Sequence, residues 1–185
     1  MKRKFKKKTF FIWLTMTFVL LIFFGLNKEY IDILLIQEFV GQNKIFIAII
    51  YVFLLSILGL FFIPSTPFAM AGVILFSPLE AYLLNLIGIV TSSFIVYHFA
   101  KFLSLDKVFE KKYPNKIKKL KGALQNKELP IIAIWSFLPI VPTDMIIYVA
   151  STLKISIKKS ILGVIIGEGT LNLFYIFFTG SIFGL

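Results

Sequence analysis

The sequence predicts an all-α integral membrane protein with about four transmembrane helices and two opposed re-entrant hairpins. First, its 185 residues are 58% hydrophobic and only 16% charged, with a mean hydropathy of +0.91. That composition leaves too little polar surface for a soluble domain. Second, long uncharged segments alternate with short basic ones. Third, paired prolines interrupt two of the uncharged segments at corresponding places.

The net charge of +11 comes from lysines that lie beside apolar segments, within Lys2–Lys8, Lys107–Lys121 and Lys154–Lys159. This layout is typical of juxtamembrane charge that faces anionic lipid. The sequence contains no zinc-ligand spacing, RNA-binding aromatic signature or helix-turn-helix pattern. Nucleic acid is therefore not an expected partner.

Catalytic and metal chemistry have few candidate residues. The chain has no cysteine and one histidine, His98. Disulfides, thiolate catalysis and cysteine-ligated metals are thus excluded, and a histidine metal cluster or a Ser-His-Asp triad is implausible. No nucleophile–base pair stands out. We expect no enzyme activity, no metal and no cofactor.

Residues 1–44 form the first predicted unit. After the basic start, Thr9–Asn27 is uncharged for 19 residues, which is long for the apolar region of a signal peptide, and no A-x-A-like cleavage site follows. We therefore expect an uncleaved transmembrane helix. Lys28–Lys44 mixes apolar and acidic residues, which favours a short interfacial helix.

Residues 45–184 form the second unit, a membrane domain. Ile45–Leu79 is uncharged over 35 residues, too long for one spanning helix and too short for two, which need about 40 residues. Pro64 and Pro67 divide it. We expect Ile45–Ile63 to span and residues 64–79 to form a re-entrant hairpin, which requires protein or water to satisfy its backbone.

The next predicted elements are a span over Ala81–Ala100 and a basic interfacial segment over Lys101–Glu128, with a break at Tyr113–Asn115. Residues 129–153 are again apolar and again interrupted, by Pro139, Pro142 and Asp144. This pattern predicts a second re-entrant hairpin. A last span covers residues 160–185.

The two halves share a pattern. The Pro-x-x-Pro pair at 64 and 67 recurs 75 residues later, and a glycine follows 21 residues after each second proline, at Gly88 and Gly163. Corresponding proline-interrupted segments are typical of transporters built from inverted repeats. Chance recurrence of common residues is the alternative.

The predicted topology contains a conflict. The basic start places the N-terminus in the cytoplasm, and four spans return the C-terminus to the same side. The same count places Lys101–Glu128 outside, against the positive-inside rule. Either the rule is overridden, or one predicted hairpin crosses the membrane.

The segments "PSTPFAMAGVILF" and "FLPIVPTDMIIYVAS", each followed by a glycine-containing helix, resemble the DedA family. This family is also called the SNARE-associated Golgi protein or VTT-domain family, and the resemblance is to its branch with P-x-x-P-x-D in the second half. It covers roughly residues 45–184. It implies two facing re-entrant hairpins and movement of lipids between leaflets. Bacterial members are linked to recycling of undecaprenyl phosphate and to phospholipid flipping, and eukaryotic members are scramblases.

The chain departs from the family at charged positions. Ser136 stands where many members carry arginine, and Pro142 stands where DedA proper carries another. DedA proper also has an acidic residue in its first hairpin, where this chain has Ser65, Thr66 and Phe68. The resemblance therefore implies lipid movement without implying the arginine-dependent, proton-coupled mechanism of DedA proper.

Asp144 is the first candidate site residue. A charge at bilayer depth costs about 2.5–3.5 kcal/mol on insertion scales, so it needs a partner or water. Asp144 either acts as a proton-linked or phosphate-linked switch in a hydrated cleft, or caps the helix that follows Pro142. The two roles can coexist.

Two glutamates are further candidates. Glu168, between two glycines in the last span, either carries a proton or forms hydrogen bonds at a close helix crossing. Glu80 begins a helix, where interaction with the helix N-terminus is the simpler role. Polar residues on the spans, Asn85, Ser92, Ser93 and Asn172, either line a cleft or bond between helices.

The predicted function is transport of a membrane lipid, flippase or scramblase in type, moving a phospholipid or polyprenyl-phosphate headgroup. The alternatives are a proton-coupled transporter of a small ion or solute and a non-transporting scaffold. The expected partners are membrane lipids, with a homo-oligomer left open, and the expected location is the bacterial cytoplasmic membrane. The predicted transport residues are Asp144, Glu168, Pro64, Pro67, Pro139, Pro142, Thr143, Ser136 and Glu80. The headgroup lysines are Lys154, Lys158 and Lys159, for which ordinary snorkelling is the alternative.

Overall fold

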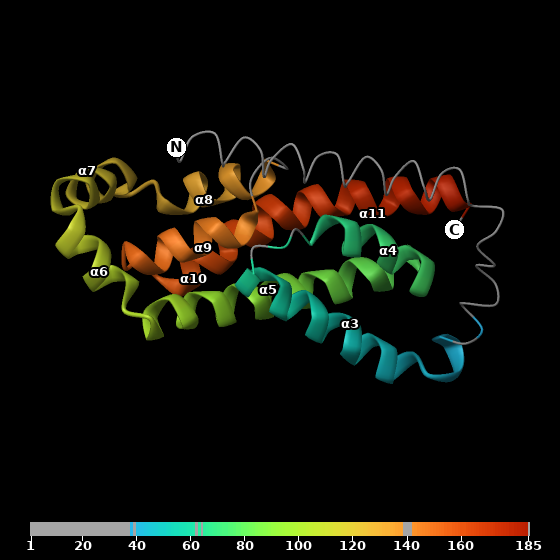
Figure 1. Ribbon diagram of the computed structural model, residues 1–185. Helices are drawn as coiled ribbons and strands as arrows, with labels where there is room; N and C mark the ends of the chain where they lie inside the picture. Colours follow the sequence, from blue (N-terminus) through green and yellow to red (C-terminus); the bar gives the residue numbers. More distant parts are fainter. Residues whose placement is uncertain (1–37, 39, 62, 64, 139–141, 185) are drawn as a thin grey trace, which may run out of the picture.

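The computed structural model describes residues 38, 40–61, 63, 65–138 and 142–184 (Figure 1). The first predicted span, most of the predicted interfacial helix, Pro64 and Pro139 lie outside these residues. The described residues are helical throughout, with short connections and no strand, so the predicted all-α class is confirmed.

The helices are α3 (Lys44–Leu58), α4 (Thr66–Leu75), α5 (Pro78–Phe102), α6 (Leu105–Lys112), α7 (Pro114–Leu124), α8 (Glu128–Phe137), α9 (Thr143–Thr152), α10 (Ile157–Val164) and α11 (Thr170–Phe183). A 3₁₀ turn, Gly59–Phe61, extends α3, and a π-helical turn, Ile165–Gly169, joins α10 to α11. The break predicted at Tyr113 is confirmed, since α6 ends before it and α7 begins after it.

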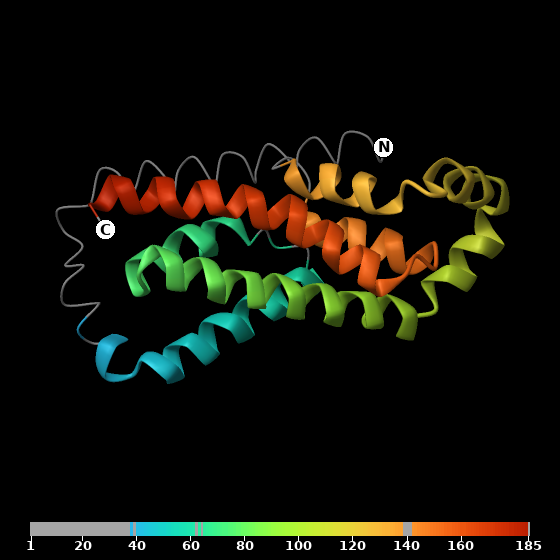
Figure 2. The same cartoon turned by 180° about the vertical axis from the view of Figure 1, so that it is seen from behind.

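Two long antiparallel helices, α5 and the continuous α10–α11, form the frame of the molecule (Figures 1 and 2). They are joined by two buried amides, because Asn172 Nδ2 donates to Asn85 Oδ1 at 2.9 Å. Both helices are long and apolar enough to cross a membrane, as predicted for these segments.

The first hairpin consists of α3 and α4, and both of its ends lie at the end of the bundle where α5 begins (Figure 1). Lys44, at the start of α3, forms an ion pair with Glu80, at the start of α5, at 2.5 Å. The far end of α3 reaches only the middle of α5, where Gly59 lies against Ser92. The Tyr51 hydroxyl donates to Phe68 O at 3.1 Å and links the two helices.

This arrangement differs from the expected one. Residues 64–79 were expected to form a hairpin by themselves, but they contain the single helix α4, whose antiparallel neighbour is α3. The helix and turn over Lys44–Phe61 are long and apolar enough to span. Length and composition alone therefore cannot distinguish a spanning helix from one arm of a hairpin.

The second hairpin consists of α8 and α9 and lies at the opposite end, where α5 ends and α10 begins (Figure 2). Its first helix packs closely against the glycines of α10 and the π-helical turn. A Cβ atom at Gly163 would come within 2.7 Å of Ile132, and one at Gly167 would overlap the carbonyl oxygen of Ala133. Small residues permit this close packing of helices.

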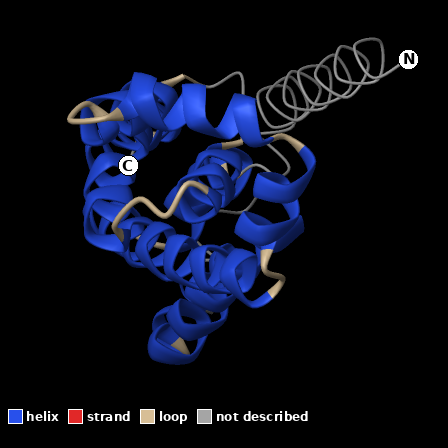
Figure 3. Ribbon diagram, turned by 90° about the vertical axis from the view of Figure 1, so that its left-hand side faces the viewer, coloured by secondary structure: helices blue, strands red, loops and turns tan. Residues whose placement is uncertain are grey.

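Apolar packing is divided between the two hairpins. One core cluster, which includes Leu55, Val73 and Ile176, lies between the first hairpin and the frame. The other, which includes Ile132 and Ile147, lies between the second hairpin and the frame. Helices α6 and α7 connect α5 to the second hairpin and turn away from the bundle axis, as Figures 1 and 3 show.

We predict that the Asn85–Asn172 pair couples the two frame helices energetically. Replacing either residue by leucine leaves the other amide buried without its partner, so each single change should lower thermal stability in detergent. The double change removes both amides, so its loss of stability should be smaller than the sum of the two single losses. The difference should be about 0.6–1.7 kcal/mol. Additive losses would contradict a direct interaction.

Candidate functional site

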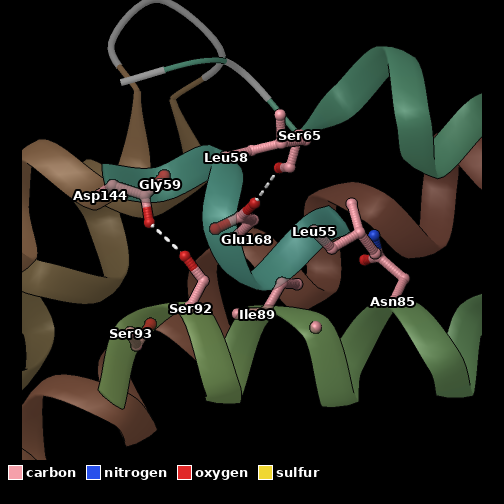
Figure 4. Close-up of a pocket in the computed structure, with 11 residues that line it drawn as sticks. Leu55, Leu58, Gly59, Ser65, Asn85, Ile89, Ser92, Ser93, Asp144 and Glu168 are labelled. Carbon is pink, nitrogen blue, oxygen red and sulfur yellow. Dashed lines mark hydrogen bonds between the residues drawn. The ribbon is translucent and has the colours of Figure 1, made fainter. Parts of the chain in front are cut away.

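The candidate site is a narrow polar cavity at the centre of the bundle (Figure 4). It is enclosed by the end of α3, the start of α4, the middle of α5, the start of α9 and the π-helical turn. Its volume is about 10 Å³, close to what one water molecule requires. The two hairpin tips thus approach each other around a small polar space.

Glu168 projects into this cavity from the π-helical turn and is 8% exposed. Ser65, just before α4, donates to Glu168 Oε1 at 2.6 Å. The side chains of Thr143 and Asn172 also lie close enough to interact with this carboxyl group, and Asp144 interacts with it electrostatically. Glu168 therefore contacts both hairpin tips.

Asp144 is the second residue of α9, and its Oδ1 accepts a hydrogen bond from Ser92 on α5 at 2.9 Å. The N-cap residue is Pro142, which forms no side-chain cap. The carboxyl group of Asp144 also interacts with its own backbone N–H. Asp144 thus contacts both the start of its own helix and a serine that lines the cavity.

The hydrogen bonds connect the two halves crosswise. Ser65 belongs to the first hairpin and bonds the long helix that follows the second, whereas Asp144 belongs to the second hairpin and bonds α5, which follows the first. Figure 4 shows both bonds among the residues that line the cavity. Each hairpin tip is thus hydrogen-bonded to the long helix of the other half.

Gly59 makes the Asp144–Ser92 contact sterically possible. A Cβ atom at this position would overlap both Asp144 Oδ1 and Ser92 Oγ. The end of α3 therefore covers the hydrogen bond directly with backbone, and no larger residue fits without displacing it.

Glu168 lies in the π-helical turn, at the cavity. Single π turns within α-helices are rare and frequently occur at functional sites. This turn coincides with the close approach of Gly167 to the end of α8. Glu168 lies 11 residues after Ile157 and 15 before Phe183, or about 17 and 23 Å along the helix. It is therefore near the middle of the segment.

Among the other predicted transport residues, Thr143 begins α9 near Glu168, Pro67 is the second residue of α4, and Pro142 precedes α9. Ser136, at the end of α8, is 1% exposed and lies beside Gly167. Its hydroxyl has no hydrogen-bond partner among the described residues.

Glu80 and the predicted headgroup lysines lie away from the cavity. Glu80 forms a capping box with Ser77 at the start of α5, as expected for its simpler role. Lys154 pairs with Asp106 at 3.4 Å, and Lys159 pairs with Glu128 at 3.3 Å. Lys158 is exposed at the same end of the bundle. Within the described ranges, no group of three His, Cys, Asp or Glu residues could hold a metal.

Sequence reasoning missed three features of the site: the bond from Ser65, the close contact of Gly59 and the π-helical turn. The glycines on either side of Glu168 were the only available signal for the turn. Ser65 and Gly59 carry no pattern of their own, because their roles depend on which helix ends meet.

A family model of the VTT domain matches residues 63–181, which is more than half of the chain. The chain belongs to the VTT-domain family. The match includes the short helices α4 and α9 and both carboxyl groups of the cavity. A search of curated proteins and a search of solved structures each find no match.

Family membership establishes a membrane protein of the DedA type, in agreement with three helices long and apolar enough to span. It assigns neither the branch with P-x-x-P-x-D nor a transported substrate. A substrate can therefore be proposed only from the residues of the cavity.

We predict that Gly59→Ala disrupts the cavity. The added methyl group would displace Asp144 or Ser92, so thermal stability in detergent should fall by about 1–3 kcal/mol, the usual range for overpacking. Gly41→Ala is the matched control, since no atom of the described residues lies within 4 Å of its Cβ position. Equal stability of the two variants would show that α3 does not end against the Asp144–Ser92 bond.

Proposed function

We propose that this VTT-domain protein moves the headgroup of a membrane phospholipid or polyprenyl phosphate across the bilayer, flippase or scramblase in type, while the tails stay in lipid. The observation that carries the proposal is the meeting of two carboxyl groups, Glu168 bonded to the first hairpin and Asp144 bonded to α5, in a polar cavity at the centre of an apolar bundle. Carboxyl groups at such depth are costly and are typical of transport pathways.

The cavity offers complementary chemistry for a headgroup. The helices α4 and α9 both begin at the cavity, and helix N-termini attract phosphate. Two carboxyl groups lie beside them, and none of the described residues that line the cavity is cationic. Ionised carboxylates attract an ammonium group, and protonated ones donate hydrogen bonds to phosphate oxygens. A zwitterionic headgroup can use both features.

In this proposal the hairpins are re-entrant and the halves are an inverted repeat. Two features support this. Each hairpin has both ends at one end of the bundle, and the two hairpins enter from opposite ends (Figure 1). The repeated glycines also occupy equivalent contacts, since Gly88 packs against Leu55 of α3 and Gly163 packs against Ile132 of α8. Opposed hairpins of inverted repeats allow alternating access to a central site.

The test is lipid transfer in liposomes that contain the full chain and lipids labelled in one leaflet. Phosphatidylethanolamine, phosphatidylglycerol and a polyprenyl phosphate should be compared. We expect transfer above empty vesicles for at least one of these lipids, and at least a tenfold slower rate for Asp144→Asn and Glu168→Gln. Glu80→Gln removes an acidic residue outside the cavity and should leave the rate unchanged.

Two results would contradict the proposal. One is the absence of transfer above empty vesicles for all three lipids. The other is equal slowing by Glu80→Gln and Glu168→Gln, which would show that the cavity has no special role.

A second candidate function is proton-coupled transport of a small ion or solute. The small volume of the cavity favours it, because that space accommodates about one water molecule and not a headgroup. Transport of a water-soluble substrate that responds to a pH gradient, without any lipid transfer, would favour this function over the first.

The position of the first hairpin supports a topology without the predicted conflict. Lys44 and Glu80 lie at the same end of the bundle, which supports a first hairpin that does not cross the membrane. Three crossings then remain: the predicted first span, α5 and α10–α11. The N-terminus and the lysine-rich α6–α7 segment thereby lie together in the cytoplasm, which satisfies the positive-inside rule, and the C-terminus lies outside. We propose this arrangement in the bacterial cytoplasmic membrane.

Single cysteines test this topology directly, because the chain has none of its own. In intact cells, Ser77→Cys should react with a membrane-impermeant thiol reagent, and Lys118→Cys should react only after the cells are opened. The reverse pattern, or reaction of both in intact cells, would contradict the three-crossing arrangement.

A further inference from the structure

The segment formed by α6 and α7, here called the arm (Leu105–Leu124), is not used by the proposed transport site. It contains seven lysines and two acidic residues. Ile117 is its one buried residue, so the arm adds little to the core of the bundle. Ser104, with φ 50°, turns the chain into α6, and Asn126, with φ 62°, turns it out again after α7.

Both acidic residues of the arm are directed toward lysines of the protein itself. Glu110 pairs with Lys121 at 2.7 Å, and Asp106 and Glu110 lie 3.4 and 3.5 Å from Lys154, beyond the end of α9. The pKa of Glu110 is accordingly below its ordinary value, chiefly because Lys121 donates a hydrogen bond to it. The negative charges of the arm are thus neutralised within the protein.

The positive charges of the arm remain outward. Lys111, Lys118 and Lys119 are exposed and form no ion pair in the part of the chain that the structure describes. The surface that the arm presents to its surroundings is therefore strongly cationic.

Exposed apolar side chains accompany these lysines. Val108 is 53% exposed, Phe109 40% and Leu120 47%. Short helices that combine a basic face with exposed apolar residues are typical of elements that lie in a membrane interface. The arm also starts at the depth of the lipid headgroups. Helix α5 has 25 residues and is about 37 Å long. That length is enough to cross a hydrocarbon core of about 30 Å and end in the headgroup region.

We propose that the arm binds the anionic phospholipid headgroups of the leaflet at its own end of the bundle, with its apolar side chains at the acyl boundary and its lysines among the phosphates. Lys154 holds the acidic residues of α6 toward the bundle, so that α6 and α7 present lysines to the lipid. This inference concerns a surface outside the transport cavity and does not depend on lipid transport.

The experiment uses the full chain in lipid nanodiscs with a fluorescent label on Leu120→Cys. Quenching by phosphatidylglycerol that carries a nitroxide near its headgroup is compared with quenching by the equivalent phosphatidylcholine. We expect severalfold stronger quenching by phosphatidylglycerol, reduced by salt. A label on Leu79→Cys, at the other end of α5, should show equal quenching by the two lipids.

Matched charge changes make the test specific. Replacing Lys111, Lys118 and Lys119 with glutamine should bring the ratio of quenching by phosphatidylglycerol to quenching by phosphatidylcholine at Leu120→Cys close to one. Each lysine near an anionic surface contributes about a fivefold preference for the anionic lipid. The control replaces Lys6, Lys7 and Lys8 with glutamine, which removes the same charge elsewhere and should leave the ratio high.

Equal quenching by the two lipids in the chain with all its lysines would overturn the proposal. So would stronger quenching by iodide in water than by either lipid. That result would place the arm in the aqueous phase, where an acidic protein would be the fitting partner.

Discussion

The structure depends on one constraint: a chain that turns back in the middle of an apolar bundle must satisfy its polar groups there. Each hairpin tip meets this constraint by a hydrogen bond to the long helix of the other half, Ser65 to Glu168 and Asp144 to Ser92. Unpaired, these groups would be expensive to bury in hydrocarbon. The two bonds therefore hold together halves that otherwise meet through apolar packing.

The same constraint explains why a transport site would lie here. The polar cavity lies where the two hairpin tips meet, and the backbone approaches closely at Gly59 to enclose it. Because the bonds cross between the halves, opening the first hairpin would release Glu168, and opening the second would withdraw Asp144 from Ser92. A headgroup that replaces the lost hydrogen bond would stabilise the open form, which links binding to movement.

Local sequence pattern predicted much of this molecule. The α5 and α10–α11 segments, the break at Tyr113 and the helix after Pro142 follow from apolar length and proline position. Asp144 and Glu168 stood out because acids in apolar segments are rare. The role of α3 as a hairpin arm could not be predicted, because its 18-residue helix and turn have the length and composition of a span. Only the contact of Gly59 with Asp144 of α9 shows where this arm ends. The crosswise bonds and the π-helical turn depend on tertiary contacts, which one sequence does not reveal.

The most direct test of the central claim is the membrane depth of spin labels along the lipid-facing side of α3. Cysteines can replace the exposed Phe46, Phe53 and Phe61 one at a time in a chain without native cysteine. Depth is then measured by the ratio of accessibility to oxygen and to a water-soluble nickel complex. If the first hairpin turns back at mid-bundle, depth increases steadily from residue 46 and is greatest at residue 61. A label at residue 61 as shallow as one at residue 46 would mean that α3 crosses the membrane, which would contradict the meeting of the two hairpin tips.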